Sequence, residues 1–256
     1  DVYYNRIVAS KRMVGLRAFH NYIKSILIKC VSKKGDTLID LACGKGGDFS
    51  KWTNAKLSFV LGIDKSPDNI ENRVDGACAR YLNFRKSHKY VPDSLFVIGD
   101  TSKNIRNGNA MKTEKGAQIV RAVFGEGGKD EKRLGKGIIK QYGKAASGFN
   151  VTSCQFALHY FFEDFTMLQN FVRNIAECTH LGGYFIATAY DGKMVFDMLK
   201  NKSVNDGVSI YEDGTKLWEI KKCYSLNSFE DDSSCCGYSI DVFQESINQQ
   251  IQEYLV

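Results

Sequence analysis

The sequence predicts an α/β fold in which a doubly wound, mostly parallel sheet carries helices on both faces. Short apolar runs, several ending in an acid, alternate with helical patterns along the 256 residues. Such alternation is typical of parallel strands joined by right-handed crossovers. One run, Thr37-Leu-Ile-Asp40, is followed by a glycine-dense turn and a helix start. This combination favours a nucleoside pocket at the carboxyl ends of parallel strands.

The first half of the chain has clear periodicities. Apolar residues at helical spacing over 13–32 predict an amphipathic helix that ends near Lys33-Lys34-Gly35. Ser66 and Pro67 predict the cap and first turn of another helix. The predicted strands are short apolar runs at about 37–42, 58–63 and 94–99, with a helix at about 47–54.

The second half continues the alternation and then loosens. The predicted elements are strands at about 149–156 and 184–190, and helices at about 113–123, 136–144, 163–179 and 191–200. A polar, glycine-broken loop is expected between the helices at 113–123 and 136–144. Beyond residue 203 the pattern predicts short strand-like pieces and a final amphipathic stretch near 240–255. No linker-like boundary is visible, so we expect one domain over 1–256.

The net charge of +6 is unevenly distributed. Residues 1–35 carry eight Lys or Arg against one acid, and residues 102–148 carry eleven against four. Residues 149–256 carry seven against fifteen. Clustered cations favour a polyanionic partner such as phosphate or RNA, although two solvated lysine-rich surfaces would give the same pattern.

Composition excludes several classes of protein. No apolar run approaches the roughly 20 residues of a membrane span, and the N-terminus does not have the pattern of a signal peptide. The eight cysteines form no C-x-x-C pair, so we expect no metal site and reduced thiols. The chain begins at Asp1 without an initiator Met, and we expect it to be a fragment of a longer protein.

Three ligands compete for the glycine turn at 42–47. The spacing does not fit a phosphate-binding P-loop, and Phe49 stands where a dinucleotide fingerprint needs a small residue. S-adenosylmethionine fits best, because its enzymes combine an acid after strand one, a G-x-G-x-G-like turn and an acid after strand two. Asp40, Ala42-x-Gly44-x-Gly46 and Asp64 match that pattern.

The strand-end acids have simple physical roles in such a pocket. Glycines at 44, 46 and 47 let the methionine part of the cofactor lie against bare backbone. Asp64 is expected to accept from both ribose hydroxyls, and Asp100 from the adenine amine. A single acid at such a position is more often a helix cap, but three after three successive strands point to a ligand.

The residues after the fourth strand then resemble a known family. Asn21-Tyr-Ile-Lys-Ser25, Asp40-Leu-Ala-Cys-Gly-Lys-Gly-Gly-Asp-Phe-Ser-Lys-Trp52 and Cys154-Gln-Phe-Ala-Leu-His-Tyr160 resemble signatures of the messenger-RNA cap guanine-N7 methyltransferases. Leu181-Gly-Gly-Tyr-Phe-Ile186 and Glu253-Tyr-Leu-Val256 are also similar. The resemblance implies a seven-stranded-type Rossmann-like methyltransferase sheet, and transfer of a methyl group from S-adenosylmethionine to N7 of the terminal guanosine of capped RNA.

The resemblance also assigns roles to single residues. It implies that Lys24, Asp40, Ala42, Gly44, Gln155 and Tyr160 join Asp64 and Asp100 around the cofactor, with Ala42 departing from the family's glycine. It implies that the cap nucleotide and its phosphates meet Asn21, Lys45, Lys51 and Arg80. It further implies that guanine is held by His159, Tyr160 and Glu253. No general base is required, because N7 of guanine already has a free lone pair.

The resemblance carries expectations about the whole protein as well. It implies a basic N-terminal helix region at 1–35, a basic insert at 102–148 and a cap-binding part at 203–256. It is similar to the version in the multidomain capping enzymes of large DNA viruses, with triphosphatase and guanylyltransferase domains on one chain. The implied location is cytoplasmic (a viral factory or virion), or nuclear for a cellular homologue, with no membrane partner.

Two other functions remain open from the residues alone. One is methylation of another RNA position or of a small molecule; a ribose 2′-O enzyme would need an activating lysine after strand four, where this chain has none. The other is an inactive RNA-binding module, against which the intact Asp64, Asp100, Gln155 and Tyr160 argue.

Overall fold

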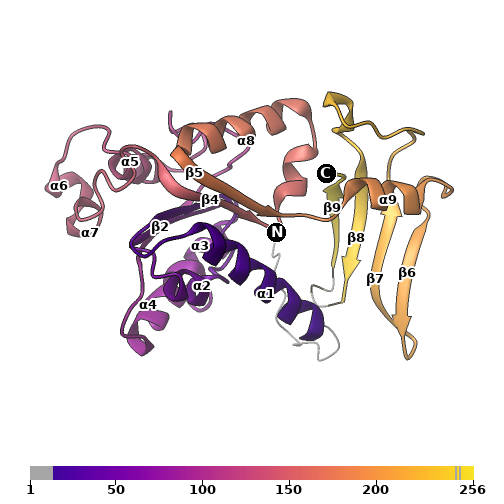
Figure 1. Cartoon of the computed structure of the whole chain (residues 1–256), viewed down its shortest axis with the longest axis horizontal. Helices are drawn as coiled ribbons and strands as arrows, with labels where there is room; N and C mark the ends of the chain where they lie inside the picture. Colours follow the sequence, from indigo (N-terminus) through magenta and orange to yellow (C-terminus); the bar gives the residue numbers. More distant parts are fainter. Residues whose placement is uncertain (1–13, 246, 248) are drawn as a thin grey trace. The chain divides into compact units, whose positions relative to one another are not determined.

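The computed structural model describes residues 14–245, 247 and 249–256, which fall into two compact units (Figure 1). The first, which we call the parallel unit, comprises Lys24–Gln155 and Gln169–Ala187. The second, the antiparallel unit, comprises the described residues up to Ile23, Phe156–Leu168 and Thr188–Val256. Each unit is described by itself. No helix in the described ranges combines the length and apolar character that crossing a membrane requires.

A five-stranded sheet in the order β3-β2-β1-β4-β5 is the centre of the parallel unit. Its strands are β1 Thr37–Asp40, β2 Phe59–Asp64, β3 Asp93–Ile98, β4 Phe149–Gln155 and β5 Thr179–Thr188. β1 pairs in parallel with β2 and β4, and β2 with β3. The predicted doubly wound, mostly parallel sheet is confirmed, but its strand count of seven is wrong for the described residues.

Helices cover both faces of this sheet, and Figure 1 shows α8 on the opposite side from α2 and α4. The helices of this unit are α2 Phe49–Asn54, α3 Pro67–Glu71, α4 Ala77–Ser87, α5 Glu114–Val123, α6 Glu131–Leu134 and α7 Lys136–Ile139, and α1 Val14–Val31 and α8 Phe165–Cys178 have residues in both units. Leu38, Val60 and Val151 of the sheet pack with Trp52 of α2 in one buried cluster. These β-branched and leucine side chains are the near-continuous apolar runs that a sheet covered on both faces requires.

Element boundaries differ from the prediction where local signals are weak. Ser66 caps α3 as predicted, since its Oγ accepts from the backbone N of Asn69 at 3.4 Å. The predicted loop within 102–148 contains α6, whose N-cap Asp130 accepts from two backbone N–H groups. α7 is shorter than the helix predicted at 136–144, and β5 begins directly after α8 rather than at Tyr184.

The antiparallel unit has a four-stranded sheet in the order β6-β7-β8-β9. Its elements are η1 Leu158–Phe162, α9 Gly192–Leu199, β6 Gly207–Glu212, β7 Thr215–Lys222, η2 Ser233–Cys235, β8 Ser239–Gln244 and β9 Gln249–Tyr254. Val195, Leu199, Ile220 and Ile240 form its core. The strands predicted beyond 203 therefore pair with one another, which explains why they do not extend the parallel sheet to seven strands.

Candidate functional site

Three acids lie at the carboxyl ends of adjacent parallel strands; we call them the strand-end acids. Asp40 is the last residue of β1, Asp64 is the last of β2, and Asp100 follows β3 by two residues. Because β1, β2 and β3 are neighbours and run in parallel, the three carboxyls gather at one edge of the sheet. The structure therefore brings together the acids that the sequence predicted.

Asp64 fixes the glycine turn. Its Oδ2 accepts from the backbone N of Gly44 at 2.8 Å, and Gly44 has the positive φ of +54° that favours glycine. Its Oδ1 accepts from Ser66 N and from Asn69 Nδ2, both at 2.9 Å. The side chain is only partly buried, so the carboxylate also has a solvent-facing part. Ser66 and Asn69 were not predicted as partners of this carboxylate.

Gly46 has a structural role that the sequence did not predict. Its φ is +70°, and a Cβ added there would lie 2.2 Å from Cζ of Phe49. The space left by the missing side chain is therefore filled by the Phe49 ring of α2. At Gly47, by contrast, an added Cβ would meet no atom within 4 Å. Of the two glycines, only Gly46 must lack a Cβ for the neighbouring ring to pack against it.

Asp40 is the most deeply buried of the strand-end acids, with 2% of its surface exposed. Burial, and then the charge of Asp48, raise the pKa of its carboxyl to about 7. Its Oδ1 accepts from the backbone N of Ala42 at 3.2 Å. The residue at the family's glycine position thus contacts Asp40 through its backbone.

Asp100 and Gln155 lie at the ends of β3 and β4. Oδ1 of Asp100 accepts from the hydroxyl of Ser102 at 2.7 Å and from its backbone N at 3.2 Å. Within the described part of the chain, its Oδ2 has no hydrogen-bond partner. The amide of Gln155 is 9% exposed and donates to Ser153 Oγ at 3.1 Å. Asp100 therefore has a carboxylate oxygen that can accept a further hydrogen bond. The side chain of Gln155 is held by a residue of its own strand.

The predicted phosphate-binding cations are already engaged by acids or backbone. The ammonium of Lys45 lies 2.8 Å from both Asp68 and Asp75; burial lowers its pKa, but these two hydrogen bonds outweigh burial and raise it. Lys24 and Lys51 share Asp48 at 2.7 and 2.8 Å.

Arg80 completes this network through the backbone of the turn. Its guanidinium donates to the carbonyl of Lys45 at 2.7 Å. Asp48, Asp68 and Asp75, none of them predicted as site residues, thus organise the cations around the glycine turn. An anion that binds these cations has to compete with, or share, their carboxylates.

A second group of predicted residues lies in the antiparallel unit. His159 of η1 and Glu253 of β9 are 5% and 8% exposed, and 3.5 Å separates His159 Nε2 from Glu253 Oε1. Burial lowers the pKa of His159 to about 4 and raises that of Glu253 to about 7. At neutral pH the imidazole is therefore neutral, and the two groups, which we call the His159–Glu253 pair, do not form an ion pair.

The imidazole of this pair lacks hydrogen-bond partners. Over the described ranges, neither ring nitrogen of His159 makes a hydrogen bond, and the 3.5 Å contact is too long to count as one. Leaving buried polar groups unsatisfied costs about 1–3 kcal/mol each. A ligand that presents hydrogen-bonding groups here would recover that free energy.

Aromatic rings frame the pair. Tyr190 stacks on His159 with centroids 5.5 Å apart and planes at 15°, and its hydroxyl donates to the carbonyl of Tyr254 at 2.6 Å. Tyr160 meets His159 edge-on at 4.2 Å. Tyr190 was not predicted, because its position at the end of a strand-like run carries no signal of its own. Asn21, also predicted, lies exposed on α1.

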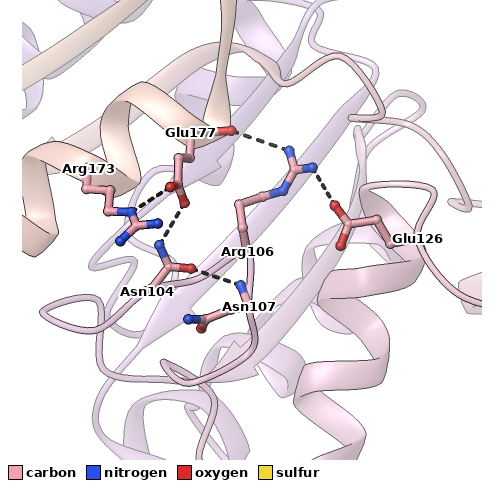
Figure 2. Close-up of a pocket in the computed structure, with 6 residues that line it drawn as sticks. All are labelled: Asn104, Arg106, Asn107, Glu126, Arg173 and Glu177. Carbon is pink, nitrogen blue, oxygen red and sulfur yellow. Dashed lines mark hydrogen bonds and ion pairs between the residues drawn. The ribbon is translucent and has the colours of Figure 1, made fainter.

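A cavity of about 500 Å³ lies elsewhere, against α8 (Figure 2). Its charged groups satisfy one another: Arg106 pairs with Glu126, Arg173 bonds Glu177 at 2.6 Å, and Asn104 donates to Glu177 at 2.7 Å. Figure 2 shows these side chains joined in a chain of contacts. We interpret the network as an anchor for the loop after β3 rather than as a ligand site.

Comparison with known proteins identifies relatives of this chain. The profile of the mRNA (guanine-N(7))-methyltransferase domain matches residues 4–256. A "Probable mRNA-capping enzyme" of Acanthamoeba polyphaga mimivirus is 29% identical over 94% of this chain and 20% of its own length. An "mRNA cap guanine-N(7) methyltransferase 1" of Oryza sativa subsp. japonica is 30% identical over 73% of this chain and 42% of its own length.

A solved structure shares the fold. The crystal structure of the PH0226 protein from Pyrococcus horikoshii OT3 has a TM-score of 0.50 at 14% identity, covering 99% of this chain and 79% of that one. The chain spans 20% to 48% of the length of the curated relatives it matches.

Proposed function

The chain belongs to the mRNA (guanine-N(7))-methyltransferase family, and from this premise we propose that it methylates N7 of the terminal guanosine of capped RNA, using S-adenosylmethionine. The observation that best supports this proposal is the His159–Glu253 pair. It is a buried carboxyl beside a neutral imidazole that makes no hydrogen bond within the described part of the chain, framed by Tyr160 and Tyr190. That arrangement offers guanine both an acceptor and flanking rings.

The strand-end acids fit a nucleoside cofactor. Asp64 presents a partly exposed carboxylate to ribose hydroxyls, and Oδ2 of Asp100 is an acceptor suited to an adenine amine. Gln155 and the turn around Gly44 would complete the binding surface, and Lys24 would meet the cofactor carboxylate. When bound, the cofactor supplies an electrophilic sulfonium methyl group.

The His159–Glu253 pair fits the Watson–Crick edge of guanine. Guanine presents N1–H and an exocyclic amine side by side, and the two oxygens of the Glu253 carboxylate can accept from both. His159, neutral at physiological pH, can hydrogen-bond without adding a positive charge. A guanine methylated at N7 is cationic, so the ionised form of Glu253 would favour the charge that develops during transfer.

The residues are expected to act by positioning rather than by proton transfer. N7 of guanine has a lone pair at neutral pH, so the reaction does not need a base. Orientation of two bound reactants can lower a barrier by about 7–11 kcal/mol. Rigid elements hold the site residues: η1 carries His159 and Tyr160, and β9 carries Glu253.

The cations near the glycine turn would bind the triphosphate bridge of the cap. Lys45, Lys51 and Arg80 are the candidates, with Asn21 toward the nucleotide. Each is now held by a carboxylate or a backbone carbonyl, so binding is expected to exchange those partners for phosphate oxygens. The mimivirus relative, named a capping enzyme, supports the further proposal that this activity works beside triphosphatase and guanylyltransferase domains.

Methyl transfer to defined RNAs tests the proposal. We expect the purified protein, given labelled S-adenosylmethionine, to modify RNA ending in GpppN and to leave triphosphate-ended RNA unlabelled. Digestion of the product to nucleosides should release 7-methylguanosine. Cofactor binding without labelling of either capped RNA or GpppN dinucleotide would contradict the proposal, as would methyl groups on ribose or on internal bases.

A further inference from the structure

Three residues gather at the amino-terminal edge of the parallel sheet, opposite the strand-end acids. Lys34, Lys56 and Tyr90 each precede a strand by three residues, namely β1, β2 and β3. Because these strands are parallel neighbours, their starts share one edge. The three side chains and Thr53 line a cavity of about 320 Å³. We call this surface the basic edge.

The lysines of the basic edge are not neutralised. Both are exposed, and in the part of the chain that the structure describes neither ammonium has an acidic partner. The acids near the starts of the neighbouring strands have other partners: Asp36, just before β1, accepts from the backbone N of Lys33, and Asp93, the first residue of β3, binds Lys140 at 2.9 Å and Gln141 at 3.1 Å. Lys140 of the basic insert balances Asp93, and the exposed Lys33, Lys34 and Lys56 outnumber the remaining acid, Asp36, so the edge carries a net positive charge.

The backbone holds one of these lysines in an unfavourable conformation. Lys56 follows α2 with φ of +56°, a left-handed position after a helix that glycine usually occupies. A lysine there is less favourable for folding than a glycine would be. The position is consistent with a requirement for the ammonium rather than for the backbone geometry.

The cavity also contains the other groups that recognise a nucleotide. Tyr90 is 46% exposed, while its hydroxyl donates to the carbonyl of Leu57 and thereby restrains the ring. The buried hydroxyl of Thr53 has no hydrogen-bond partner over the described ranges. A fixed aromatic face stacks on a base, and ammonium groups bind phosphates. An acidic protein segment would use the charge but would not need the ring.

We propose that the basic edge binds the RNA chain downstream of the cap, with backbone phosphates on Lys34 and Lys56 and a base on Tyr90. The inference rests on the proposed function, because it takes capped RNA as the substrate. A six-residue strand such as β2 is about 20 Å long. The edge therefore contributes only when the RNA extends beyond the cap by at least that distance, and a cap dinucleotide does not reach it.

A length series of capped RNAs tests this directly. Wild-type protein should show a KM that falls about ten-fold or more between GpppA dinucleotide and a capped 30-mer. In K34Q/K56Q the KM for the 30-mer should rise about ten-fold while kcat and the kinetics of the dinucleotide stay unchanged. The slope of log affinity against log salt for the 30-mer should fall by about 1.4, since each phosphate contact on a single strand contributes about 0.7.

Four further variants separate RNA binding from folding and from net charge. Y90F keeps the ring and should bind RNA as wild type does, whereas Y90A should lose roughly ten-fold in affinity. K56G relieves the left-handed lysine, so it should fold at least as stably while binding RNA more weakly. K193Q/K200Q removes two exposed lysines, one in α9 and one at its C-cap, and serves as the matched control for net charge, with no expected change.

The failures of the two proposals are distinguishable. If wild-type protein methylates neither the dinucleotide nor the 30-mer, the proposed function fails. If it methylates both with the same KM, or if K34Q/K56Q binds the 30-mer as wild type does, the basic edge is not an RNA site. Equal losses in K34Q/K56Q and K193Q/K200Q would also overturn the inference, because they would reflect net charge alone.

Discussion

The glycine turn and the His159–Glu253 pair are both proposed binding regions, but they are built in opposite ways. Around the turn, the charged side chains have partners: Asp64 accepts three hydrogen bonds, and Lys45 binds two carboxylates. Between η1 and β9, a buried imidazole and a buried carboxyl stand 3.5 Å apart with little to satisfy them. The charged groups of the first region are paired without a ligand, whereas those of the second are desolvated with few hydrogen bonds to compensate.

This difference shows where binding free energy would arise. A ligand at the turn replaces existing hydrogen bonds and solvent, so selectivity there depends on shape. Folding buries the His159–Glu253 pair in a region of low dielectric, where a hydrogen bond is stronger than in water. A ligand at the pair would supply hydrogen-bond partners to these buried groups. We therefore expect substitutions at the pair to have larger effects on substrate recognition, and substitutions at the turn to have larger effects on folding.

The largest expected effect is that two single variants of the His159–Glu253 pair have opposite pH dependences of stability. The pKa of His159 falls from 6.5 to about 4 on folding, so the unfolded chain binds its proton more tightly and stability rises as pH rises through this range. The pKa of Glu253 rises from 4.5 to about 7, so stability falls as pH rises through that range. In the wild type these two contributions oppose each other.

Single variants should separate the two contributions. E253Q retains His159, so its free energy of unfolding should rise between pH 4.5 and 6.5, whereas that of H159N, which retains Glu253, should fall. At about 1.4 kcal/mol per pKa unit at each site, the difference between the two variants should change by roughly 5 kcal/mol over this range. Urea denaturation at several pH values measures the difference, and the remaining carboxyls cancel in it. If both groups kept their ordinary pKa values in the folded protein, the difference between the two variants would not change with pH.

Removal of the Glu253 carboxyl should have the next largest effect. In E253A, kcat/KM for capped RNA should fall at least about 100-fold, close to 3 kcal/mol, because guanine loses two hydrogen bonds to a buried charge. Steady-state methylation of GpppA measures this, with tryptophan fluorescence as a check on folding. Retention of more than about a tenth of wild-type activity would show that Glu253 does not hold the base.

An effect similar in size, but on folding rather than on catalysis, separates two neighbouring glycines. G46A should destabilise the fold by about 3 kcal/mol, because its Cβ would overlap the Phe49 ring and its φ is positive. G47A is the matched control, where an added Cβ meets nothing within 4 Å, and its effect should stay within about 0.5 kcal/mol. Thermal denaturation of both glycine variants measures this difference, and similar melting temperatures would contradict the packing role of Gly46.

The sequence predicted the turn better than the pair, for a physical reason. Acids that end successive parallel strands must share an edge, so Asp40, Asp64 and Asp100 could be grouped from spacing alone. His159 and Glu253 come together only through η1 and an antiparallel hairpin, and family resemblance rather than spacing placed them in one site. Asp75 and Tyr190 lie outside every motif, and Asp48, although it belongs to the signature around the glycine turn, had no assigned role.

The sequence also contains a local signal for a hairpin after residue 203. Asp213-Gly214 joins β6 to β7 with φ values of +48° and +75°, as expected of the Asp-Gly turn that favours antiparallel hairpins. It predicts that the strands after residue 203 pair with each other instead of joining the parallel sheet. The amphipathic stretch at 240–255 likewise divides into β8 and β9, with Ile240 opposite Glu253.

The central claim is that the strand-end acids bind the cofactor and the His159–Glu253 pair binds guanine. Calorimetric titration of S-adenosylhomocysteine and of GpppA into D64N and E253Q tests it most directly. We predict that D64N weakens cofactor binding about ten-fold and leaves GpppA binding intact, and that E253Q does the reverse. A variant that weakens both ligands equally, or a cofactor loss in E253Q, would contradict the claim.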